Sequence, residues 1–129
     1  MIILMDTSTA TCELTIVDGN DNHHTYSWVA GRQMADGILA FIQRSLDAHN
    51  SNMKEISAIG FMKGPGSFTG LRIGASVCNA LSGTLSIPVV GEAGDEWQQV
   101  CLKRLASDET DEILLPFYGK EATITTPRK

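Results

Sequence analysis

Two largely apolar runs, separated by a stretch of helical periodicity, constrain the fold of this chain most strongly. The runs cover residues 2–5 and 56–62, and they lack the polar alternation of a strand with one face in water. Between them, apolar residues recur at helical spacing over residues 32–49. Strands joined by a long helix pair in parallel, so this pattern predicts a sheet with a parallel centre.

The flanking segments predict the rest of the sheet. Residues 11–17 and 23–29 alternate between apolar and polar side chains, and Asp18-Gly19 between them is a turn signal. A second helix over residues 71–85 and a short apolar strand at 87–90 follow. Three meandering strands followed by helix, strand, helix and strand is the order of a ribonuclease H-like α/β domain, so we predict a mixed five-stranded sheet with helices.

The length of 129 residues allows a single core. We expect residues 1–91 to form the ribonuclease H-like domain. Residues 92–129 are expected to dock on it as a helix, a charged connector over residues 107–112 that lies in solvent, and a tail. The apolar face expected for that helix consists of Trp97, Val100, Cys101 and Leu105.

Composition excludes several classes of protein. Ten basic against 15 acidic residues give a net charge of -5, which argues against strong nucleic-acid binding by this chain alone. Apolar residues make up 43% of the sequence, yet no window approaches the ~20 apolar residues of a membrane span. The N-terminus has no basic segment or long apolar stretch of a signal peptide. We therefore predict a cytoplasmic protein without membrane contact.

The cysteines and histidines predict neither a disulfide nor a metal centre. Cys12, Cys78 and Cys101 are odd in number and widely spaced, which is typical of buried, reduced thiols. The three histidines do not stand at zinc-site spacing from these cysteines. The sequence therefore predicts no metal and no cofactor.

Two segments resemble phosphate-binding loops. Asp6, Thr7 and Ser8 follow the first strand, at the sheet edge where ligands bind in open α/β folds, although such residues also form local turns. The second segment lies between a strand and a helix and lacks the lysine of a P-loop. Its glycines and hydroxyl residues serve either close backbone packing and helix capping or an anion. The candidate residues of this loop are Gly64, Gly66, Ser67, Thr69 and Gly70.

The second helix carries two apolar stripes. Leu71, Ala75 and Cys78 begin one stripe, and Ile73 and Val77 begin the other. A helix that only covers a sheet needs one stripe, so the second is covered either by the first helix or by a partner. We expect a partner on the pair of helices. The predicted interface consists of Met34, Ile38, Phe41, Ile42, Leu71, Arg72, Gly74, Ala75, Cys78, Leu81 and Leu85.

Residues 64–74 read GPGSFTGLRIG and resemble the TsaB family, also called YeaZ. The loop matches the family signature residue for residue, and Asp6-Thr7-Ser8 and Cys12 also stand where the family has them. The resemblance covers residues 1–91 and returns at Pro116-Phe117-Tyr118. It implies the actin and sugar-kinase type of fold, which has two ribonuclease H-like halves, with most of the second half missing here.

The resemblance also implies a function without catalysis. TsaB-family proteins are non-catalytic scaffolds for threonylcarbamoyl modification of the tRNA adenosine next to the anticodon. The implied partner is a TsaD-like paralogue, which transfers the threonylcarbamoyl group and pairs through the two helices of the N-terminal half. The ATPase TsaE is implied as third component, and a homodimer through the same helices is the alternative arrangement.

Two other functions remain open from the residues alone. A small ribonuclease H-like, metal-dependent nuclease would need several carboxylates around metal ions, and the sequence offers Asp6 and conceivably Asp36. An independent nucleotide-binding protein would use the loop at residues 63–70, although neither a P-loop nor a second lobe is present.

Overall fold

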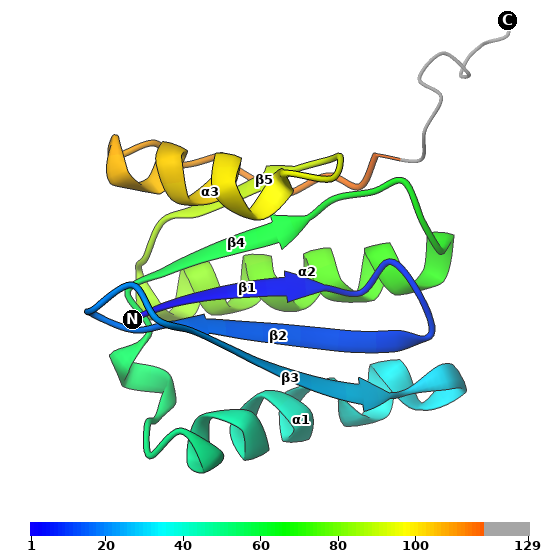
Figure 1. Ribbon diagram of the computed structural model, residues 1–129. Coiled ribbons are helices and arrows are strands. Elements are labelled where there is room, and N and C mark those ends of the chain that lie inside the picture. Colours follow the sequence, from blue (N-terminus) through cyan, green and yellow to red (C-terminus); the bar gives the residue numbers. More distant parts are fainter. Residues whose placement is uncertain (118–129) are drawn as a thin grey trace, which may run out of the picture.

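The structure is a computed structural model that describes residues 1–117, and it contains a five-stranded mixed sheet (Figure 1). The strand order across the sheet is β3-β2-β1-β4-β5. The strands are β1 Ile2–Asp6, β2 Thr11–Val17, β3 His23–Val29, β4 Ala58–Met62 and β5 Val89–Glu92. The remainder of the predicted tail, residues 118–129, with Tyr118 of the family resemblance, lies outside the described residues.

The strand pairing confirms the predicted α/β fold class. β1 is parallel to β4, and β4 is parallel to β5, as expected for strands joined by helices. β1, β2 and β3 form the predicted antiparallel meander. At the centre, Leu4 lies opposite Thr15 on one side and Gly60 on the other.

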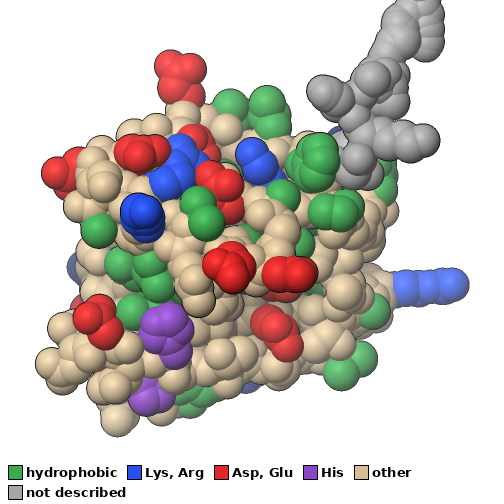
Figure 2. Space-filling model, turned by 45° about the horizontal axis from the view of Figure 1, so that its top comes forward, with side chains coloured by type: hydrophobic (Ala, Val, Ile, Leu, Met, Phe, Trp, Pro, Cys, Tyr) green, Lys and Arg blue, Asp and Glu red, His purple; other side chains and the backbone are tan. Residues whose placement is uncertain are grey.

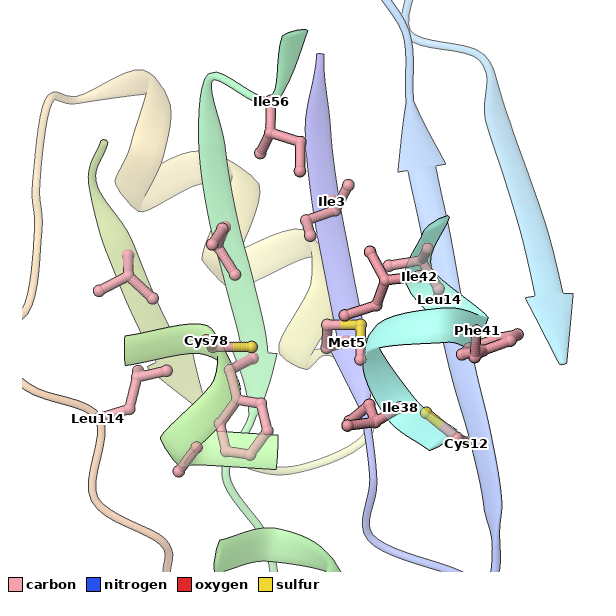
Figure 3. Close-up of a cluster of buried hydrophobic side chains, with 14 of the residues drawn as sticks. Ile3, Met5, Cys12, Leu14, Ile38, Phe41, Ile42, Ile56, Cys78 and Leu114 are labelled. Carbon is pink, nitrogen blue, oxygen red and sulfur yellow. The ribbon is translucent and has the colours of Figure 1, made fainter. Parts of the chain in front are cut away.

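Helices cover both faces of the sheet (Figure 1). They are η1 Gly31–Gln33, α1 Met34–Ala48, η2 Met53–Glu55, α2 Phe68–Leu85 and α3 Trp97–Ala106. The alternation of β1 divides the core: Ile3 and Met5 lie in the cluster with α1 and α2, whereas Leu4 lies with Trp97 and Cys101 of α3. Figure 3 shows the larger cluster between the sheet and the first two helices.

Several element boundaries differ from the sequence prediction, including the start of β4 at Ala58 rather than at residue 56. The last strand was expected at residues 87–90 but covers Val89–Glu92. Pro88 has no N–H to donate to a ladder, and Gly91 and Glu92 instead extend the pairing opposite Phe61 and Met62. The second helix begins at Phe68 rather than at residue 71, because the Ser67 side chain caps it by accepting a hydrogen bond from the Gly70 N–H.

The segment after β5 packs on the same core. Trp97, Cys101 and Leu105 of α3 are buried as predicted, but Val100 is 40% exposed and does not belong to the buried face. Leu114 is buried, and its N–H and C=O hydrogen-bond the side chain of Asn79 on α2. Leu114 thus attaches this segment to the face of the sheet that α1 and α2 cover, opposite α3.

The connector over residues 107–112 was expected to lie in solvent, and this is wrong for Asp111. Its N–H donates to the carbonyl of Val89, and its carboxylate accepts from the Gly91 N–H and from Arg104. Arg104 also contacts Glu92 and Glu109. Figure 2 shows acidic side chains interspersed with basic ones near the top of the view. Two acidic side chains of this segment, Glu109 and Asp111, are thus paired with Arg104 of α3, and composition alone does not reveal that pairing.

Candidate functional site

The two predicted phosphate-type segments lie side by side and are hydrogen-bonded to each other. The Ser67 N–H donates to the carbonyl of Ser8 at 2.7 Å, and the Thr7 hydroxyl donates to the carbonyl of Gly70 at 2.7 Å. Thr7 is fully buried. β1 and β4 are parallel neighbours, so the segments that follow them leave the sheet at the same edge.

Close packing accounts for the glycines of this loop. A Cβ added at Gly66 would lie 2.5 Å from the Cβ of Ser8, and one at Gly70 would meet the carbonyl oxygen of Thr7. A Cβ at Gly74 would overlap the Thr7 hydroxyl and approach Cε1 of Phe61 to 2.7 Å. The backbone of α2 therefore approaches the end of β1 more closely than any residue with a side chain permits.

The Asp6 carboxylate is turned into its own segment. Its Oδ1 accepts hydrogen bonds from the Ser8 N–H at 2.9 Å and the Ser8 hydroxyl at 2.6 Å. This is the local turn that the sequence allowed as an alternative to a ligand site, and it is confirmed. Within residues 1–117, Asp6 belongs to no group of three or more His, Cys, Asp or Glu side chains close enough to share a metal ion, and neither does Asp36.

Most of the predicted interface residues lie in the core of this chain, so the prediction is wrong as a set of exposed contacts. The stripe of α2 that begins with Leu71, Ala75 and Cys78 faces the sheet, because those positions complete the core opposite Phe61. On α1 the buried residues likewise face the sheet. Buried members of the predicted interface are Met34, Ile38, Phe41, Ile42, Leu71, Gly74, Ala75 and Cys78. Leu81 and Leu85 are half-buried, and only Arg72 is exposed.

The other stripe of α2 forms the outer surface. A groove between the N-terminal turns of α1 and α2 is lined by Ala35, Phe68, Thr69, Arg72, Ile73, Ser76 and Val77. A second hollow shares Ala35, Thr69 and Ile73 and continues to Thr9, at the turn between β1 and β2. Phe68 is 56% exposed, and Leu39, one turn after Ala35 on α1, is 52% exposed. We call this surface the α1–α2 face.

The groove between α1 and α2 contains one cationic side chain, Arg72. Its guanidinium lies 5.2 Å from the centroid of the Phe68 ring, a distance at which a cation and an aromatic ring attract. Thr69 is exposed in the same groove. The groove therefore combines apolar side chains with one cation at its loop end, and Phe68 and Arg72 are of residue types that are enriched at protein interfaces.

The three thiols are buried, as the sequence predicted. Burial, reinforced by the nearby carboxylates of Asp6 and Glu13, raises the pKa of Cys12 to about 12. Burial also raises the pKa of Cys78, and it raises that of Cys101 to about 12. The thiolate is the reactive form of cysteine, so these thiols are unreactive at neutral pH.

The structure brings together one cluster that the sequence analysis missed. Asp18, His24 and His49 place one ligand-type atom each within 4.8 Å of one another. The three residues come from separated elements, and the motif spacing used to look for metal ligands does not detect such a set.

None of the helices in residues 1–117 is long and apolar enough to span a bilayer.

The strand order, the helices on both faces and the loop packed on the end of β1 define an α/β domain of the ribonuclease H-like type found in actin and sugar kinases. The family model described as "TsaD: tRNA N6-adenosine threonylcarbamoyltransferase" matches residues 28–93, half of the chain. The relatives below carry the name TsaB or YeaZ, and this chain belongs to the TsaB (YeaZ) family.

Three similar proteins illustrate the relationship. The tRNA threonylcarbamoyladenosine biosynthesis protein TsaB of Buchnera aphidicola subsp. Acyrthosiphon pisum is 34% identical over 69% of this chain and 40% of its own length. The protein of the same name from Escherichia coli is 32% identical over 70% of this chain and 38% of its own length. The structure of YeaZ from Pseudomonas aeruginosa has a TM-score of 0.66 and 29% identity, over 71% of this chain and 43% of that one. The chain thus spans about two-fifths of the length of these relatives.

Proposed function

We propose that this chain is a non-catalytic scaffold subunit for threonylcarbamoyl modification of the tRNA adenosine next to the anticodon. Its family membership supports this role, since the relatives in Buchnera and Escherichia coli are named as tRNA threonylcarbamoyladenosine biosynthesis proteins. The chain acts by binding a TsaD-like protein through the α1–α2 face, and TsaE joins as a third component.

The exposed apolar side chains of α1 and α2 carry this proposal. Leu39 and Phe68 are each more than half exposed, and the groove between the two helices is mainly apolar. The family model for the threonylcarbamoyltransferase matches the segment that contains both helices. A paralogue with the same helix pair presents a similar apolar surface, and two such pairs pack around a pseudo-two-fold axis as four helices. A homodimer uses the same arrangement.

We also propose that the loop at the end of β1 has no catalytic role. The Asp6 carboxylate is hydrogen-bonded to Ser8, and the loop glycines are in contact with the Thr7-Ser8 backbone. These contacts favour a loop that stabilises the domain and positions the start of α2. With a net charge of -5, the chain depends on its partner for contact with tRNA.

Co-purification with the cognate TsaD-like protein tests the proposal. The variant Leu39→Arg places a charge on an exposed position of the α1–α2 face. Ala80→Arg does so on the outer stripe of α2, where Ala80 is exposed three residues after Val77. Val100→Arg is the matched control, because Val100 is an apolar side chain of α3 with 40% exposure on another surface. We expect each face variant to bind the partner at least about tenfold more weakly than the original chain does, and the control to bind it as tightly as the original chain.

Size-exclusion chromatography of each variant alone separates the two arrangements. If a face variant no longer self-associated but still bound the TsaD-like partner, the α1–α2 face would be the interface of a homodimer and not of the heterodimer. Equal retention of the partner by all three folded variants would contradict the proposed interface. In vitro modification of tRNA by the reconstituted proteins, with and without this chain, tests the scaffold role itself.

A further inference from the structure

Apart from the α1–α2 face, the surface of the chain carries a cluster of two imidazoles and one carboxylate. Asp18 follows β2, His24 lies on β3, and His49 follows α1. The rings of His24 and His49 are in contact, with centroids 4.6 Å apart, and Nε2 of His24 lies 3.4 Å from Oδ2 of Asp18. Figure 2 shows histidine side chains (purple) exposed at the surface of the molecule.

The turn between β2 and β3 fixes the Asp18 carboxylate. Its Oδ1 accepts hydrogen bonds from the N–H groups of Asn20 at 2.9 Å and Asn22 at 3.0 Å. These bonds orient Oδ2 toward His24. An ionised carboxylate with one oxygen already held is pre-oriented as a ligand.

The distances agree with coordination of a single ion. Zinc bonds to imidazole nitrogen and carboxylate oxygen of roughly 2.0–2.1 Å place neighbouring tetrahedral ligands about 3.4 Å apart. The pair formed by His24 and Asp18 already has this separation, and all three ligand atoms lie within 4.8 Å. In a tetrahedral site, rotation of the half-buried His49 side chain would close the remaining gap, and water would complete the fourth position.

The end of α1 adds a favourable field. His49 is the C-cap residue of this 15-residue helix, whose last turn contains no basic side chain. The C-terminal end of a helix carries a partial negative charge that attracts cations. Two imidazoles with one carboxylate suit zinc and related transition-metal ions, whereas calcium and magnesium prefer an all-oxygen set.

We propose that Asp18, His24 and His49 bind one divalent transition-metal ion, such as Zn²⁺, on the surface of this chain. The ion joins the β2–β3 turn to the C-terminal end of α1. Its two histidine ligands, His24 and His49, are 25 residues apart in the sequence. It thereby stabilises the edge of the sheet opposite β5. This site is independent of the α1–α2 face and of the proposed scaffold function.

Calorimetric titration of the whole chain with Zn²⁺ tests the site. The variants are His24→Ala and His49→Ala, and the matched control is His23→Ala, because His23 is the exposed neighbour of His24 on the opposite face of β3. We expect saturable binding of one ion, tighter than about 100 µM, that His24→Ala and His49→Ala each weaken by more than about tenfold. The control should stay within about twofold of the original chain.

Two further measurements identify the ligands. The Co²⁺-loaded chain should show the absorption of a tetrahedral site without a thiolate charge-transfer band, which excludes binding to the cysteines. Zn²⁺ should raise the Tm of the original chain and of His23→Ala but not that of His49→Ala. Absence of saturable binding, a thiolate band, or equal loss in His23→Ala would overturn the proposal, and circular dichroism without metal verifies that each variant is folded.

Discussion

Gly74→Ala and Gly83→Ala add the same methyl group to α2 and should change the stability of the chain in opposite directions. At Gly83 nothing lies within 4 Å of the added Cβ, whereas at Gly74 the Cβ meets the Thr7 hydroxyl, Cγ2 of Thr7 at 2.9 Å and Cε1 of Phe61 at 2.7 Å. Thr7 and Phe61 are fully buried, and the Thr7 hydroxyl is hydrogen-bonded to Gly70. Neither neighbour has room to withdraw.

The magnitudes follow from two opposing effects. Replacing glycine by alanine inside a helix is worth up to about 1 kcal/mol, and this is the whole effect expected at Gly83. At Gly74 the same gain is outweighed by overpacking, which costs about 1–3 kcal/mol, and by damage to the Thr7 hydrogen bond, worth about 1 kcal/mol. We expect a net loss of about 1–3 kcal/mol for Gly74→Ala and a gain of up to about 1 kcal/mol for Gly83→Ala.

Urea unfolding followed by circular dichroism measures both differences in the free energy of unfolding. A third variant, Thr7→Ala combined with Gly74→Ala, removes the obstructing side chain and should cost less than the sum of the two single changes. If Gly74→Ala were as stable as Gly83→Ala, or if the two changes in the double variant were additive, the packing explanation of the glycine motif would be wrong. The motif would then require a ligand to account for it.

Two further predictions concern the thiols and the Arg104 network. Iodoacetamide at pH 8 should leave Cys12, Cys78 and Cys101 unlabelled in the native chain and label all three in urea, as read by mass spectrometry; rapid labelling of the native chain would contradict their burial and raised pKa values. Burial alone would raise the pKa of Asp111, but the hydrogen bonds from Arg104 and Gly91 hold it below 3.8 in the folded chain. The stabilisation that these bonds give is therefore fully present above pH 3.8, and it is lost as the pH falls through the pKa of Asp111 in the folded chain. Arg104→Leu should therefore cost about 1 kcal/mol at pH 7 and progressively less below pH 3.8, and a cost independent of pH would exclude the ion pair as its cause.

The strands were predictable because their signal is local. Thr11–Val17 and His23–Val29 have the predicted bounds, since alternation of period two identifies both the strand and the face that it buries. The glycine loop was also predictable as a close approach of backbone, and its hydrogen bonds to the Thr7-Ser8 segment confirm that interpretation.

The orientation of α2 was not predictable in the same way. Its two stripes are similarly apolar in sequence, but the helix turns Leu71, Ala75 and Cys78 toward the sheet and leaves Phe68 exposed. Gly70 and Gly74 determine this orientation, because only they allow the backbone to lie against Thr7. The distinction depends on contacts between residues more than 60 positions apart.

By itself, the sequence determined the α/β fold, the strand order along the chain and the glycine motif that marks the TsaB family, because each depends on neighbouring residues with a fixed period or spacing. Only the tertiary structure decided which helix stripe is the outer surface, which acidic residues of the connector are paired, and that Asp18, His24 and His49 converge. Those features depend on the relative placement of separate elements, which the packing of one complete core fixes and no local pattern encodes.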